Sequence, residues 1–317
     1  MRWLVTGVNG FVGGHLVARL AEADASVWGT VRPGTPATAG YAPLQADLLD
    51  PSAVEAAVAQ ARPDRIVHLA AQSSARDSWD DPAGTLGTNL LGLLHLLEAV
   101  RRQGLLPRVL VVGSSDEYGA PEAEGPVAED TPLRPVSPYA VSKLAQGYLA
   151  LQYALAHGLP CVRTRTFNHT GPGRGAGFAE SSFARQIAEI EAGRREPVIR
   201  VGNLDVVRDF SDVRDVVRAY LLLVERGTPG EVYNVASGSG VSMGEILERL
   251  LQLSPARVEV RRDPTLLRPA DVPRIVGDAE KLRRATGFVP EIPLERTLAD
   301  LLAYWRERVA AEEGVTR

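Results

Sequence analysis

Three side chains in this sequence have the types and spacing of a proton-transfer site. Tyr139 lies four residues before Lys143, so the two share one face if this segment is a helix. Free tyrosine has a pKa of about 10, and a neighbouring ammonium lowers that pKa by favouring the phenolate. Ser114 closes the apolar run 109–112, where its hydroxyl could hydrogen-bond a substrate oxygen. Together they predict chemistry at a hydroxyl or ketone carbon.

A glycine-rich turn near the start of the chain predicts a dinucleotide site. Gly7, Gly10 and Gly13 follow the apolar run 3–5 and lead into a helical pattern. Gly7 permits a tight turn, Gly10 lets the backbone approach a pyrophosphate, and Gly13 lets the helix pack on the strand. Free N–H groups at the helix N-terminus would then face the phosphates. The spacing differs from the commoner G-x-G-x-x-G, and a glycine turn that holds no ligand is the alternative.

The end of the second expected strand bears on the choice of cofactor. An Asp or Glu there would bind the ribose 2′-hydroxyl and repel a 2′-phosphate, but residues 28–32 contain no acid. Arg32 stands where a cation could meet that phosphate, so we expect NADP(H), with NAD(H) possible if Arg32 is a solvated surface residue. The other cofactor-binding candidates, in the turn and at the strand ends, are Asn9, Phe11, Val12, Asp47, Leu48, Leu69, Ala70 and Ala71.

The elements that must position these residues alternate along the first half of the chain. Strands are predicted at 3–6, 26–30, 65–69, 109–113 and 161–166. Helices are predicted between them at 11–23, 51–61, 84–103 and 138–157, and later at 182–193, 213–225, 243–253 and 294–309. This alternation predicts an α/β fold with a doubly wound parallel (Rossmann) sheet. We expect a dinucleotide-binding domain over 1–166 and a smaller α/β substrate-binding region over 167–317, with part of 212–234 returning to the first sheet.

Composition excludes several other classes. The net charge of −4 provides no basic field for a nucleic acid. Cys161 is the only cysteine, so neither an intrachain disulfide nor a cysteine metal cluster is possible, and no metal site is expected. The apolar runs are too short for a signal sequence or a membrane span. We therefore expect a soluble cytoplasmic protein.

These motifs resemble those of the extended short-chain dehydrogenase/reductase family, and the likeness runs from Met1 to about Trp305. Segment 6–13 resembles the family's cofactor turn, and 68–71 and 114–119 resemble its strand-end motifs. The resemblance implies that Ser114, Tyr139 and Lys143 form the catalytic trio, with Tyr139 and Lys143 also binding the cofactor, Lys143 at its ribose. It further implies a homodimer in which helices 84–103 and 138–157 of two subunits form a bundle.

The second half of the chain is similar to segments of enzymes that handle GDP-mannose derivatives. This similarity implies that Arg208 and Arg268 clamp a diphosphate, a role that suits the guanidinium fork, and that Asn168 hydrogen-bonds it. Surface solvation, or an ion pair with Asp209 or Asp271, is the alternative for the two arginines. The remaining substrate-binding candidates are Ser73, Ser114, Ser115, Val201 and Asn203. His169 is not included, because a lone histidine more often packs than catalyses.

The resemblance leaves several reactions open. GDP-mannose 4,6-dehydratases need an extra acid/base, typically a Glu two residues before the tyrosine of the Tyr-Gly pair. That position here is Asp116, a candidate catalytic acid, with Glu117 one place along. Segment 72–79 and the compact loop after Gly171 look more like the reductases of the group. We expect NADP(H)-dependent reduction of the C4 ketone of a GDP-4-keto-6-deoxyhexose to a GDP-rhamnose-type product. The alternatives are a GDP-mannose 4,6-dehydratase, a nucleotide-sugar 4-epimerase and, more remotely, a non-catalytic dinucleotide-sensing regulator.

Overall fold

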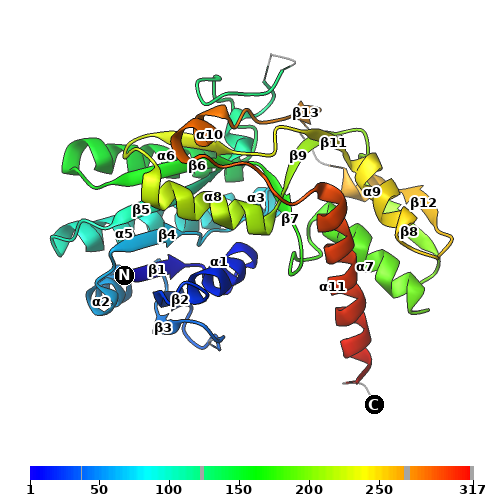
Figure 1. Ribbon diagram of the computed structural model, residues 1–317, viewed down its shortest axis with the longest axis horizontal. Helices are drawn as coiled ribbons and strands as arrows, with labels where there is room; N and C mark the ends of the chain where they lie inside the picture. Colours follow the sequence, from blue (N-terminus) through cyan, green and yellow to red (C-terminus); the bar gives the residue numbers. More distant parts are fainter. Residues whose placement is uncertain (37, 122–124, 268–271, 315–317) are drawn as a thin grey trace.

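A seven-stranded parallel sheet forms the centre of the computed structural model, which describes residues 1–36, 38–121, 125–267 and 272–314 (Figure 1). Its strands, in spatial order, are β10 (Val232–Val235), β6 (Cys161–Thr166), β5 (Arg108–Ser114), β4 (Arg65–His68), β1 (Arg2–Thr6), β2 (Ser26–Val31) and β3 (Ala42–Gln45). The chain winds outward in both directions from the β1–β4 neighbours, which creates a crevice at their carboxyl ends. The predicted doubly wound α/β fold is confirmed.

Helices cover both faces of this sheet. On one face, α1 (Phe11–Ala21), α8 (Val213–Arg226) and α10 (Glu280–Thr286) pack over a shared apolar core. On the other face lie α2 (Pro51–Ala61), α5 (Gly92–Arg102) and α6 (Pro138–His157). Asp50 caps α2 by accepting from Ser52 N at 2.9 Å, and Pro51 occupies the first helical position. Such burial of apolar faces is the main force that stabilises the layers.

The helix expected at 84–103 is divided in the structure. It consists of α4 (Pro82–Leu86), the π-helical segment η1 (Gly87–Leu91) and α5. The wider π turn directs Asn89 inward, where its amide donates to Gln72 O at 3.1 Å and to Ser142 Oγ at 2.7 Å. By length and composition alone, 82–102 could cross a membrane, but part of it packs in the core through residues such as Leu93, Leu96 and Leu97.

A second region, formed mainly by residues after Phe167, packs against the carboxyl edge of the first sheet (Figure 1). Its four-stranded sheet contains β7 (Asn168–Thr170), β9 (Val207–Asp212), β11 (Gly240–Ser242) and β13 (Arg274–Ile275), and β8 (Val198–Val201) pairs with β12 (Glu259–Arg262). Helices α7 (Ala179–Glu191), α9 (Met243–Gln252) and α11 (Leu294–Gly314) enclose its apolar core. The shorter elements are α3 (Asp77–Asp80), η2 (Ser115–Tyr118) and η3 (Pro264–Leu266). Between β9 and β11, the chain returns to the first sheet as α8 and β10.

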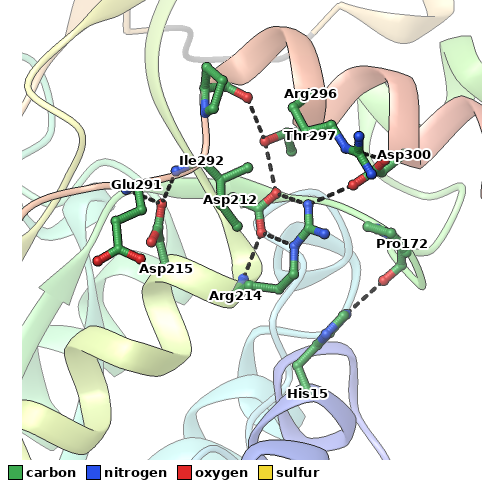
Figure 2. A network of polar contacts seen from close by, with 11 residues as sticks. His15, Pro172, Asp212, Arg214, Asp215, Glu291, Ile292, Arg296, Thr297 and Asp300 are labelled. Atoms are coloured by element: carbon green, nitrogen blue, oxygen red, sulfur yellow. Dashed lines mark hydrogen bonds and ion pairs between the residues drawn. The ribbon is translucent and has the colours of Figure 1, made fainter.

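A polar network holds the two regions together (Figure 2). The buried carboxylate of Asp212, the N-cap of α8, accepts from Arg214 Nε at 2.8 Å and from Thr297 Oγ1 of α11 at 2.8 Å. The other end of the Arg214 guanidinium donates to Asp300 of α11 at 2.8 Å. Asp215 accepts from two backbone N–H groups just before α11. The network therefore fixes the position of the second region relative to the first sheet.

Candidate active site

A cleft of ≈ 1210 Å³ lies where the carboxyl ends of β1, β4 and β5 face the second region. All the predicted site residues within the described part of the chain line it. They are Gly7, Asn9, Gly10, Phe11, Val12, Gly13, Arg32, Asp47, Leu48, Leu69, Ala70, Ala71, Ser73, Ser114, Ser115, Asp116, Tyr139, Lys143, Asn168, Val201, Asn203 and Arg208. Arg268 lies outside the described residues. The topology thus gathers residues that are more than 200 positions apart in sequence.

The glycine turn has the close contacts that a dinucleotide site needs. Gly7 has φ +71°, and a Cβ there would lie 2.8 Å from Ala70 N. A Cβ at Gly13 would lie 2.4 Å from Gly7 O, so α1 packs directly on the turn. Gly10 is the N-cap of α1 and has no side chain to cap the helix, which leaves the first N–H groups for a ligand. This cradle fits the pyrophosphate of a dinucleotide.

The loop after β2 shapes the expected adenosine end of the cleft. Arg32 is exposed there, and Thr35, which also lines the cleft, donates its backbone N–H to Arg32 O at 3.0 Å. The Asn9 side chain fixes this loop by accepting from Tyr41 OH at 2.5 Å and donating to Pro36 O at 3.3 Å. A cation and a hydroxyl at the mouth of the cleft suit a 2′-phosphate.

The predicted trio meets at the start of α6 and the end of β5. Tyr139 lies in the first turn of α6, which is capped by Ser137, and its hydroxyl is hydrogen-bonded by the Ser114 side chain. Lys143 lies one turn further on, is only 4% exposed, and donates from Nζ to Val112 O at 3.0 Å. These three residues, which were predicted to share one site, lie together in the structure.

The pKa of Tyr139 differs from the sequence-based expectation. Burial raises it well above the ordinary value, and the nearby Asp116 carboxylate raises it further, while the Ser114 hydrogen bond and Arg174 oppose these effects. The cation that lowers this pKa is Arg174 rather than the expected Lys143, and desolvation outweighs its effect. Burial also lowers the pKa of Lys143 to about 8, against the opposing effect of Glu117. At neutral pH, Tyr139 is a protonated phenol and can act as a proton donor.

The two neighbouring carboxylates have different surroundings. Asp116 is half-buried and lines the cleft near Tyr139. Glu117 is buried behind the cleft, where it accepts from Ser114 N at 3.0 Å and from Arg165 Nε at 3.0 Å. Asp116 is therefore the carboxylate on the ligand side, in agreement with its choice as the candidate acid.

The substrate side of the cleft is lined by the second region. Arg208 of β9 donates from Nη1 to Val272 O at 2.7 Å and to Val207 O at 2.9 Å. The neighbouring Asp209 carboxylate is buried and accepts from the backbone N–H groups of Ser237 and Gly238. The two carbonyl groups position the Arg208 side chain, which lines the cleft together with Asn168.

The comparisons with known proteins agree with this geometry. The family model for GDP-mannose 4,6 dehydratase matches residues 4–301. The chain belongs to the GDP-mannose 4,6-dehydratase family. The GDP-6-deoxy-D-mannose reductase of Pseudomonas aeruginosa is 39% identical over 98% of this chain and 99% of its own length. A GDP-mannose 4,6-dehydratase of Yersinia enterocolitica is 31% identical over 81% of this chain and 77% of its own length.

Solved structures of related proteins share the fold over nearly the whole chain. The structure of RMD from Pseudomonas aeruginosa complexed with NADPH has a TM-score of 0.85 and 38% identity, covering 97% of this chain and 100% of that one. The UDP-glucose 4-epimerase of Thermus thermophilus in complex with NAD has a TM-score of 0.87 and 30% identity, covering 96% and 99%. Membership of this family of extended short-chain dehydrogenases/reductases confirms the predicted resemblance.

Arg174 is a residue in the cleft of this family member that sequence analysis missed. Its guanidinium carbon lies 3.3 Å from the ring centroid of Phe178 and 5.1 Å from that of Phe11, next to the glycine turn. Its Nε lies 3.5 Å from a Glu180 carboxylate oxygen. The loop that carries it is held to α1 by His15 Nε2, 2.8 Å from Pro172 O (Figure 2). Arg174 lies in a loop rich in glycine and proline. Such a loop has no hydrophobic periodicity from which the direction of its side chains could be predicted.

Two histidines lie at this cleft, His68 buried behind it and His169 half-buried in its lining. His68, at the end of β4, lies with Nδ1 2.9 Å from Thr6 Oγ1, and burial together with Lys143 lowers its pKa to about 3. His169 stacks on Phe11 with ring centroids 6.0 Å apart, and burial lowers its pKa to about 4. His169 therefore packs as a neutral ring in the lining of the cleft.

The buried, neutral His68 predicts acid sensitivity. Below the ordinary histidine pKa of 6.5, the unfolded chain binds protons that folded His68 does not, so the free energy of unfolding decreases as pH falls toward about 3. We expect His68 to account for about 3 kcal/mol of this loss by about pH 4. Urea unfolding at a series of pH values should show a shallower pH dependence in His68→Gln. The exposed His157→Gln is the control, and equal slopes in both variants would contradict the prediction.

Proposed function

We propose that this protein reduces the C4 ketone of GDP-4-keto-6-deoxymannose with NADPH. The observation that carries the proposal is the protonated, half-buried Tyr139, whose hydroxyl is hydrogen-bonded by Ser114 inside a cleft that has a dinucleotide cradle. A phenol with a raised pKa suits proton donation, which reduction requires. The 39% identity to a GDP-6-deoxy-D-mannose reductase supports the substrate, and the likeness to an NADPH complex supports the cofactor.

The chain's own residues account for the proton and for the binding of both ligands. The dinucleotide, when bound, supplies the hydride for C4. Gly7, Gly10 and the N-terminus of α1 hold its pyrophosphate, and Arg32 holds its 2′-phosphate. Arg208 and Asn168 hold the diphosphate of the sugar nucleotide.

Proton transfer completes the reduction. Ser114 hydrogen-bonds the oxygen on C4, and Tyr139 gives its phenolic proton to that oxygen as the carbonyl becomes a hydroxyl. Lys143 also holds the cofactor ribose. Its ammonium favours the phenolate that remains on Tyr139, which regains its proton from solvent.

Removal of the phenolic hydroxyl tests the role of Tyr139. Tyr139→Phe keeps the ring but has no proton to give, so we expect turnover to fall by at least about a hundredfold. NADPH affinity should change little, because the cradle and Arg32 are untouched. NADPH oxidation followed by absorbance measures turnover, and fluorescence titration measures binding. A parallel loss of affinity and turnover would instead assign Tyr139 a structural role.

The alternative reaction is 4,6-dehydration of GDP-mannose, because Asp116 lines the cleft near Tyr139 where that reaction needs an additional acid/base. That reaction returns its hydride within one catalytic cycle and needs no added reductant. We expect pure protein incubated with GDP-mannose without NADPH to form no 4-keto-6-deoxy product, as followed by mass spectrometry. Loss of water from the sugar nucleotide under these conditions would favour the dehydratase and contradict the reductase proposal.

We further propose a cytoplasmic homodimer. Four apolar side chains on η1 and α6 are exposed: Leu91, Val141, Tyr148 and Leu155. Such a face is stabilised when it packs against its own copy about a two-fold axis. Sedimentation should give twice the chain mass for the wild type and a lower mass for Val141→Glu. A wild type that sediments as a monomer would contradict this assembly.

A further inference from the structure

A buried ion pair lies directly behind the turn that carries Ser114. Arg165 Nε of β6 donates to Glu117 Oε2 at 3.0 Å, and the two side chains are only 6% and 4% exposed. Burial of two charges is costly, and apolar replacements of such pairs often leave stability unchanged or improve it. Stability alone therefore does not explain why the fold contains this pair.

The second carboxylate oxygen of Glu117 fixes the backbone of Ser114. Glu117 Oε1 accepts from Ser114 N at 3.0 Å, and Ser114 and Glu117 form a capping box on η2. Ser114 Oγ also accepts from Asp116 N at 3.1 Å. The carboxylate also packs on the end of β5, because a Cβ at Gly113 would lie 2.4 Å from Glu117 Oε1. Glu117 thus sets where β5 ends and which way Ser114 and Asp116 face.

Arg165 is itself held from several sides. Its Nη1 donates to Glu129 O at 2.8 Å and to Tyr118 OH at 3.1 Å, and its guanidinium lies over the Tyr118 ring at 4.9 Å. Tyr118 OH in turn donates to Asn234 Oδ1 of β10 at 2.7 Å. A guanidinium fixed from β10, η2 and the loop before α6 holds the Glu117 carboxylate in one orientation.

Burial raises the pKa of Glu117 itself, and the hydrogen bond from Ser114 N and the Arg165 charge oppose this rise and favour the carboxylate. As a carboxylate, Glu117 acts on the charges of the trio. It raises the pKa of Lys143 against the effect of burial, and it raises the pKa of Tyr139 in the same direction as Asp116 does. The other charged group that acts on Tyr139 is Arg174, which lowers its pKa, and His68 is neutral beside Lys143. Loss of the Glu117 charge would lower the pKa of both Lys143 and Tyr139.

We propose that Glu117 and Arg165 form a positioning pair for the reaction. Glu117 orients Ser114 and keeps Lys143 cationic, and Arg165 fixes Glu117. Neither residue touches the substrate. The inference rests on the proposed function only in taking Ser114, Tyr139 and Lys143 as the reacting site.

The sequence offers a readout that does not need activity. It contains only two lysines, Lys143 and Lys281, so protein labelled with ¹³C-lysine gives two side-chain signals. Lys143 should titrate near its lowered pKa of about 8. In Glu117→Gln we expect this midpoint to fall by about one pH unit, because the neighbouring negative charge is lost. The signal of Lys281, which pairs with Glu231 at 2.7 Å, is the internal control.

Kinetics provide the second readout. Reduction needs protonated Tyr139 and Lys143, so the rate falls as pH rises through their pKa values. In Glu117→Gln we expect the alkaline limb of kcat to move to lower pH and kcat itself to fall about ten- to hundredfold, because Ser114 is less well oriented. Asp212→Asn alters another buried carboxylate, which pairs with the partly exposed Arg214 and does not line the cleft, and should leave both the Lys143 midpoint and the alkaline limb unchanged.

The double variant Glu117→Leu/Arg165→Leu separates positioning from stability. We expect denaturant unfolding to show wild-type stability, while the lower Lys143 midpoint and the reduced kcat persist. A double variant with wild-type kcat and midpoint would overturn the inference, as would an unchanged midpoint in Glu117→Gln. If wild-type protein does not turn over GDP-4-keto-6-deoxymannose, the proposed function fails, and the lysine titration still decides the electrostatic role of Glu117.

Discussion

The buried ammonium of Lys143 is the charge around which the cleft is arranged. It is almost fully removed from water, and its hydrogen bond to Val112 O anchors it to the strand next to β4. A cation in such a place needs a nearby negative charge, which Glu117 supplies, and it adds to the effect of burial in lowering the pKa of His68. Glu117 in turn pairs with Arg165. The desolvation penalty of the buried ammonium is therefore offset by Glu117 and Arg165, which lie behind β5 and on β6.

The fold places these charges in a cleft that has two walls. The crevice at the carboxyl ends of β1 and β4 exists wherever a parallel sheet winds both ways from its centre. The other wall of the cleft comes from the second region. This region is held in place through α8, which packs on the first sheet and whose N-cap, Asp212, is hydrogen-bonded to α11. The substrate wall therefore cannot shift far without breaking contacts of the dinucleotide-binding layer.

Much of this could be predicted from sequence, because local patterns determine it. The glycine turn, the strand–helix alternation and the Tyr139–Lys143 spacing each depend on residues within one or two turns of each other. Strands such as β13, with two residues, carry too short a pattern, and their pairing partners are distant in sequence. The pKa of Tyr139 was expected to be lowered and is raised, because burial is a property of the whole fold. The π turn at Asn89 and the inward direction of Arg174 depend likewise on tertiary contacts.

The scarcity of lysine gives the molecule an unusual alkaline behaviour. Arginine supplies nearly all of the 35 basic side chains, and guanidinium groups keep their proton throughout the range in which amines lose it. Mildly alkaline solution therefore neutralises the one amine in the interior of the cleft while the outer cations remain. The electrostatic potential of the cleft can therefore change with pH. The arginines on the surface, which govern solubility and the approach of anionic ligands, keep their charge.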